Sequence, residues 1–220
     1  MPNQAMHADL LQRAASISGR LVAASQTGDG SRWAEESSSM NPFTESANPL
    51  TSSSRLRELA QDSCELVRRR VAGNASTPID ILFALLEDPD CWVAWNLAQN
   101  SAASPELLNE LTARRLFLEK VASNHRSPGP LLAQLAREPD QGIREAVAVN
   151  PMTPASVLEE LAGASELRVR WCVARNTSAA GALLERLASD SEEKVRQAVA
   201  RNRNTPAATK RALKQKLGYR

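Results

Sequence analysis

The chain has 220 residues, and only 4% of them are aromatic while 42% are hydrophobic. Any core must therefore be built from small and aliphatic side chains packed at helical spacing, which favours an all-α fold. The formal net charge is only +2, and no run approaches the roughly 18 apolar residues that a membrane span needs, so we expect a cytoplasmic protein without a membrane partner.

The first 54 residues fall outside the regular pattern of the chain. Residues 10–16 resemble the repeat segment 183–189, so residues 1–24 are predicted to form an N-terminal helix, which could be a degenerate cap repeat. Residues 25–54 are rich in Ser and contain Gly28 and Gly30. We expect a flexible linker there, although residues 41–44 and 48–51 resemble the loop of the repeat.

Residues 55–206 are predicted to form an array of about six helical repeats, each of 26 residues except a third one that is two residues shorter. Each unit ends at an Asn that follows an aliphatic residue and an Ala, and a further apolar residue lies seven positions before the Asn. This spacing is typical of one face of a helix. The anchors are Asn74, Asn100, Asn124, Asn150, Asn176 and Asn202.

A first helix precedes this second helix in every unit, and it carries Leu residues and an Ala, such as Leu132, Leu135 and Ala136. Thr-Pro or Ser-Pro pairs mark its start, and we expect the hydroxyl to cap its free N–H groups. An acid lies twelve residues before most anchors and is predicted to cap the second helix. The third unit lacks this turn, so a local irregularity is expected there.

Residues 207–220 are predicted to form a basic capping helix, because a terminal repeat has one face without a neighbour. One unit is too small to bury its own apolar face. The units must therefore stack into a short solenoid with one continuous core.

The repeat motif is clearest in residues 131–154 and 183–206, where it reads Leu-Leu-x-x-Leu-Ala, then Asp, then Val-Arg-x-x-Val-Ala-x-Asn-x-x-Thr-Pro. This motif resembles the bacterial leucine-rich repeat variant family, a HEAT-like helical repeat. The family is described as alternating α and 3₁₀ helices in a right-handed superhelix, which implies that one helix per unit is shorter than the ten or eleven residues of the pattern. At least one member carries a cysteine-bound iron–sulfur cluster ahead of its repeats. No cysteine precedes Cys64 here, and no Cys or His has metal-ligand spacing, so no cofactor or metal is expected.

The candidate binding surface consists of second-helix positions that vary between units, eight, five and one residues before the anchor. Trp and Arg there are residue types enriched at interaction hot spots, although Trp95 and Trp171 could instead pack over the next helix. The predicted partner-binding residues are Trp92, Trp95, Glu145, Arg168, Trp171, Arg175, Lys194, Gln197 and Arg201. The arginines Arg68, Arg144, Arg170 and Arg196 recur six before the anchor, and they could pair with the recurring acid or form a ladder for phosphates.

The favoured function is a non-enzymatic interaction scaffold for a protein partner, with no small-molecule substrate. Nucleic-acid binding by the basic C-terminal half is the alternative. A third hypothesis is a DNA glycosylase-like enzyme that uses Asp90, Trp92 and Trp95, and it requires Asp90 to be exposed in a concave cleft. Cys172 stands where neighbouring units have Ala, so we expect it to be a small buried hydrophobic residue.

Overall fold

The computed structural model describes residues 41–217, and these residues form helices and turns without any strand. The first helices of the units are α3 (Ser53–Leu59), α5 (Ile79–Ala84) with the 3₁₀ helix η1 (Leu85–Glu87), α7 (Pro105–Ala113), α9 (Gly129–Leu135), α11 (Ala155–Leu161) and α13 (Gly181–Leu187). The second helices are α4 (Glu65–Gly73), α6 (Cys91–Gln99), α8 (Leu118–Ser123), α10 (Gln141–Val149), α12 (Leu167–Arg175) and α14 (Glu193–Arg201). Two helices flank the six pairs, α2 (Pro42–Glu45) and α15 (Ala207–Leu217).

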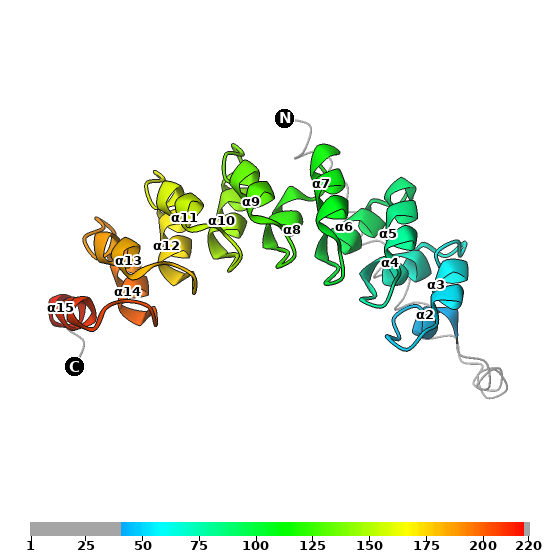
Figure 1. Cartoon of the computed structure of the whole chain (residues 1–220), viewed down its shortest axis with the longest axis horizontal. Helices are drawn as coiled ribbons and strands as arrows, with labels where there is room; N and C mark the ends of the chain where they lie inside the picture. Colours follow the sequence, from blue (N-terminus) through cyan, green and yellow to red (C-terminus); the bar gives the residue numbers. More distant parts are fainter. Residues whose placement is uncertain (1–40, 218–220) are drawn as a thin grey trace, which may run out of the picture. The chain divides into compact units, whose positions relative to one another are not determined.

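The pairs follow one another in chain order, as Figure 1 shows, and each second helix packs against the second helix of the next unit. In Figure 1 the second helices α4 to α14 lie on the inner side of the curved row of units. The predicted all-α repeat solenoid of about six two-helix units is therefore confirmed, whereas its handedness stays a prediction.

The core is continuous along the array. Leu132 of α9 and Val147 and Ala148 of α10 are completely buried, and the equivalent residues of the other units are buried with them, except Ala200 of the last unit, which is partly buried. Full burial of a Leu or Val side chain contributes roughly 1.5–3 kcal/mol. Since each unit offers only a few such side chains, stacking of neighbours supplies the stability of the array.

The first helices are short. Most have six or seven residues, fewer than the pattern suggests, and their ends tighten into i→i+3 hydrogen bonds such as that from the Glu138 N–H to the Leu135 carbonyl. In the second unit this end is the 3₁₀ helix η1. One helix per unit is thus shorter than expected from spacing, as the family resemblance implies.

The recurring Asn side chains form a ladder that joins every unit to the one before it. The Nδ2 of Asn150 donates to the carbonyls of Ala122 and Asn124, at 2.7 and 2.9 Å, while its Oδ1 accepts from the Met152 N–H. All six anchors are buried and repeat these bonds. An amide can donate and accept at once, which is why Asn occupies this position in each unit.

The predicted role of the hydroxyl before the Pro is wrong at most units. Thr77, Thr153 and Thr205 donate to the carbonyls of Val71, Val147 and Val199, near the end of the preceding second helix. The last carbonyls of a helix lack partners within the helix, and the hydroxyl satisfies one of them. Ser104, in contrast, does cap its helix, since it accepts from the Leu107 N–H.

The recurring acid does not cap the second helix either. Asp88 accepts from the Asp90 N–H and so forms the turn before the helix, and Asp90, two residues later, is the cap that accepts from the Trp92 N–H. The acid stands too early in the chain to reach the first N–H groups of the helix. Its carboxylate instead binds an arginine of the preceding unit.

The third unit is irregular, as predicted. Its second helix α8 has six residues, and Arg115 and Phe117 in the turn before it have φ angles of 55° and 48°. This left-handed conformation is uncommon for residues other than Gly. The turn is two residues shorter, and the left-handed residues turn the chain within the length that remains.

The predicted linker at 25–54 extends too far toward the array. Residues 42–45 form α2, and Ser46 and Asn48 offer their carbonyls to the Nδ2 of Asn74. Asn48 also accepts from the Leu50 N–H, the same bond that every anchor makes. The chain at 42–52 thus corresponds to the end of a further second helix with its own anchor. The predictions for residues 1–40 lie outside the described residues.

Candidate binding surface

The variable positions lie on the second helices, which stand side by side along the inner side of the array (Figure 1). Trp92 and Trp95 lie on α6, Glu145 on α10, the next three predicted residues on α12 and the last three on α14. All nine are half-buried or exposed, in contrast to the buried anchors.

The two tryptophans of α6 form one aromatic cluster. Their ring centroids are 5.7 Å apart in an edge-to-face arrangement, and the Lys120 ammonium of α8 lies 6.0 Å from the centroid of Trp95. An aromatic pair with a nearby cation presents apolar area and positive charge together. Lys120 was not among the predicted residues, since it lies four residues before its anchor, outside the three variable positions of the candidate surface.

A second cluster joins α10 and α12. Arg168 binds the carboxylate of Glu145 at 3.1 Å, and the guanidinium of Arg175 stacks 4.4 Å from the Trp171 ring centroid. Trp171 packs against the core and is half-buried. One part of the Trp171 ring thus packs as the structural interpretation expects, and the other part is exposed, while binding by this residue stays a prediction.

The third group of predicted residues lies on α14. Lys194 and Gln197 help to line an open hollow of about 400 Å³, together with Leu167, Glu192 and Glu193. Gln197 donates to Glu193, and Arg201 is exposed at the end of the helix. The structure thus brings the nine residues into three neighbouring groups, and no single pocket collects them.

The recurring arginines tie adjacent units together. Arg68 binds Asp88 at 2.6 Å and Arg170 binds Asp190 at 2.8 Å, while Arg144 binds Glu166. Burial opposes ionisation of Asp88 and Asp190, but the hydrogen bonds from the two arginines and from backbone N–H groups prevail and lower the pKa of each carboxyl below its usual 3.8. These pairs favour the structural interpretation over a phosphate ladder.

The irregular turn provides a substitute at the third unit, whose second helix has Leu118 in place of the recurring arginine. Arg115 reaches the carboxylate of Glu138 in the next unit at 2.9 Å. The connection between units is kept even where the helix cannot supply it.

Asp90 does not meet the requirement of a glycosylase. Its carboxylate is only 14% exposed and is bound by Arg69, and it also caps α6 through the Trp92 N–H. A carboxylate engaged in this way is not free to act on a base in a cleft, so the glycosylase hypothesis is wrong.

Cys172 is buried, as predicted, and burial raises the pKa of its thiol to about 11. A thiol with so high a pKa is a poor nucleophile at neutral pH. Within residues 41–217 no group of three Cys, His, Asp or Glu side chains could hold a metal ion. In the same part of the chain, every helix is too short or too polar to cross a bilayer.

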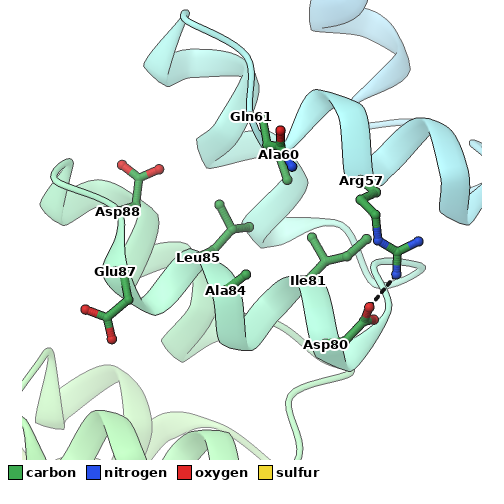
Figure 2. A pocket seen from close by; sticks show the side chains of 9 residues that line it. All are labelled: Arg57, Ala60, Gln61, Asp80, Ile81, Ala84, Leu85, Glu87 and Asp88. Carbon is green, nitrogen blue, oxygen red and sulfur yellow. Dashed lines mark hydrogen bonds and ion pairs between the residues drawn. The ribbon is translucent and has the colours of Figure 1, made fainter.

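A second hollow, of about 330 Å³, lies on the side of the first helices α3 and α5 (Figure 2). Ala60, Ala84 and Leu85 contribute its apolar lining, and the exposed pair Arg57 and Asp80 closes one end. The hollow has none of the predicted residues.

Two exposed apolar side chains flank the anchor Asn150, since Val149 and Met152 are both 56% exposed. Val149 stands one residue before the anchor and so belongs to the predicted variable positions, although it was not among the named partner-binding residues. Met152 was missed, because it lies in a loop that the helix pattern does not cover.

Comparison with known proteins shows which repeats and folds this chain is similar to. Residues 142–203 match the model of the Leucine Rich Repeat Variant domain. The chain is similar to a solved structure described as a leucine-rich repeat variant with a novel repetitive protein structural motif, with 27% identity, a TM-score of 0.52, and coverage of 75% of this chain and 72% of that chain. No curated protein matches the chain. Residues 142–203 thus match the Leucine Rich Repeat Variant domain, and the fold of the array is similar to that of a leucine-rich repeat variant, as the resemblance of the motif predicted.

Proposed function

We propose that the chain is a non-enzymatic scaffold that binds a protein partner through the variable face of its second helices. This proposal is based on the difference in burial between the recurring and the variable positions of each second helix. The recurring residues are buried or paired across units, whereas the positions that differ between units stay half-buried or exposed.

The composition of the variable face supports a protein partner. Trp92, Trp95 and Trp171 keep part of their surface free, and each cluster lies beside a cation. Trp and Arg are the residue types that dominate the energetics of protein interfaces. Rings that are held by a neighbour lose little conformational freedom on binding, which favours affinity.

Quantitative affinity capture from cell extract tests the proposal with three baits: the wild type, a face variant with Trp95→Ala and Trp171→Ala, and a control with Ile79→Ala and Phe83→Ala. The control removes exposed apolar side chains of α5. We expect proteins that the wild type and the control retain equally and that the face variant loses by tenfold or more, since a hot-spot residue contributes about 2 kcal/mol or more. Equal recovery with the face variant would refute the proposed surface.

Nucleic-acid binding is the second candidate, because the basic side chains of α14 and α15 have no acidic partner among the described residues. Anisotropy of labelled single- and double-stranded DNA and RNA at low and at physiological salt tests it, with a variant carrying Arg168→Ala, Arg175→Ala and Arg201→Ala. Salt-dependent binding that this variant loses would favour a nucleic-acid partner. Absence of binding at low salt would exclude it.

A further inference from the structure

The C-terminal end of the array carries basic side chains without acidic partners. Between residues 194 and 217 the chain has no Asp or Glu. None of the basic residues there forms an ion pair within residues 41–217, although arginines of the first, third, fourth and fifth units do. These residues are Lys194, Arg196, Arg201, Arg203, Lys210, Arg211, Lys214 and Lys216.

Arg196 is the last of the recurring arginines, and half of its usual bonds are missing. In the preceding unit the Nη1 of Arg170 donates to the carbonyls of Ala164 and Ser165, and its Nε and Nη2 donate to Asp190. The Nη1 of Arg196 makes the equivalent bonds, to the carbonyls of Asp190 and Ser191, both at 2.7 Å. Its Nε is buried and has no partner in the described part of the chain.

The missing partner has a simple structural cause. The residue 26 positions after Asp190 is Lys216, and it belongs to α15, which stays helical where earlier units turn. α15 packs on α14 through the buried Leu213 and covers the end of the core. The cap therefore closes the apolar core but brings a lysine to the position that holds Asp88 in the second unit and Asp190 in the sixth.

A buried N–H of a charged group without an acceptor is destabilising, and an acceptor that reaches it gains a strong, charge-assisted bond. The bonds from Nη1 hold the guanidinium of Arg196 in the orientation that binds a carboxylate in the earlier units. Arg196 is half-buried rather than enclosed. The surrounding lysines and arginines add long-range attraction for negative charge.

We propose that the C-terminal end of the array binds an acidic segment of a protein partner. One Asp or Glu carboxylate of that segment binds Arg196, in the same way as a carboxylate of the following unit binds Arg68, Arg144 and Arg170. This inference rests on the protein-binding function proposed above and adds the chemistry of the segment that is recognised. It uses the end of the array, whereas the tryptophans lie on earlier units.

A carboxylate fits this place better than a nucleic-acid backbone. Binding along a phosphate backbone needs a row of free cations, but the guanidinium groups of Arg68, Arg144 and Arg170 are already bound to carboxylates. Among the described residues, Arg196 is the one member of the row without a carboxylate partner, and the side-chain partners of the other three arginines are all carboxylates.

Fluorescence anisotropy with the full chain tests this proposal. The probe is a short fluorescein-labelled peptide of alternating Glu and Gly, and the reference is the same peptide with Gln in place of Glu. We expect binding of the Glu peptide and about tenfold weaker binding by both Arg196→Gln and Arg196→Lys, because a lysine keeps the charge but not the two-pronged geometry. The matched control Arg126→Gln removes an exposed arginine that has no ion pair among the described residues, and it should bind like the wild type.

Equal affinity of Arg196→Gln and Arg126→Gln would overturn the proposal, because the attraction would then be general. So would duplex DNA that binds in an Arg196-dependent way while the Glu peptide does not bind. Thermal melting keeps the result interpretable: Arg196→Gln removes the two bonds to the carbonyls of Asp190 and Ser191, so we expect a small fall in melting temperature and one cooperative transition well above the assay temperature. Trp171→Ala should still bind the Glu peptide. If the Glu peptide does not bind as proposed, the affinity capture therefore still tests, independently, whether the variable face binds a protein.

Discussion

Two kinds of polar side chain hold neighbouring units together. The buried anchors bridge backbone carbonyls of adjacent units, and the arginines of one unit bind acids of the next. Both interactions are largely shielded from water, so the loss of one partner leaves the other unsatisfied. The same residue types therefore recur along the array for structural reasons.

Arg170→Gln is expected to lower the free energy of unfolding by about 3 kcal/mol, because it leaves the nearly buried carboxylate of Asp190 without its partner. Urea unfolding at neutral pH measures this loss. The control Arg186→Gln breaks the exposed pair with Glu159 and should change stability by less than about 1 kcal/mol. A similar effect of the two substitutions would contradict the role assigned to the buried pair.

The lowered pKa of Asp88 and Asp190 sets a pH window for this contribution. Each carboxyl has a lower pKa in the folded chain than its ordinary 3.8, so its stabilisation is complete above that value and is lost as pH falls through the folded pKa. The stability difference between wild type and Arg170→Gln should shrink below about pH 4. A constant difference down to pH 2 would contradict the ion-pair account.

Asn150→Asp is expected to destabilise the array strongly at neutral pH while changing almost no volume. The carboxylate would face the carbonyls of Ala122 and Asn124, which now accept from the amide. Burial and these acceptors should raise the pKa of the new acid, so its penalty falls as pH decreases toward that pKa. Melting temperatures at pH 7 and pH 5 check this, and a larger penalty at pH 5 would contradict the ladder.

At the scale of elements, the short helices depend on the units beside them. Neither helix of a unit reaches the length at which an isolated helix is stable in water, and the first helices have mostly six or seven residues. The end of the array therefore needs α15, whose Leu213 is 3% exposed. Without this helix the apolar side of α14 would face solvent.

Leu213→Ala tests the cap. Truncation of a buried Leu costs about 2–5 kcal/mol, and we expect the last unit to unfold at lower urea concentrations than the rest. Lys214→Ala, its exposed neighbour, should leave the unfolding curve within about 0.5 kcal/mol of wild type. Equal curves for both variants would show that α15 is not part of the folded array.

The sequence predicted the helices because anchors, apolar stripes and Pro positions recur at a fixed period. It did not predict which partner each polar group takes. A Thr before Pro lies between two helix ends, and spacing cannot say that Thr153 donates to Val147 rather than accepts from the next helix. For Asp88 the recurring arginine was one of the expected partners, but spacing could not say that this arginine is Arg68, 20 residues away in the previous unit.

The remaining misses are departures from the repeat itself. α2 is a second helix shortened to four residues, so the apolar pattern of a full helix is absent. The left-handed turn at Arg115 and Phe117 contains no glycine at these positions from which it could be predicted. In the candidate surface, the variable positions could be predicted from the sequence. The position of Lys120 beside Trp95 could not, because it depends on the distance between α6 and α8.

At the scale of the whole array, the recurring residues form a framework and the variable residues form part of its surface. Each unit contacts its neighbours along the chain, so stability is close to a sum over units and their interfaces. The variable residues add little to that sum, which leaves them free to differ and to bind.

Urea unfolding of two variants tests this separation most directly. Asn176→Ala removes one buried anchor, and we predict a loss of about 3 kcal/mol from its two unsatisfied carbonyls and one N–H. A triple variant with Arg168→Ala, Gln197→Ala and Arg201→Ala changes three variable positions, and we predict a total loss below about 1 kcal/mol. A triple variant as unstable as Asn176→Ala would show that the variable face also holds the array together, and would contradict the division between framework and binding surface.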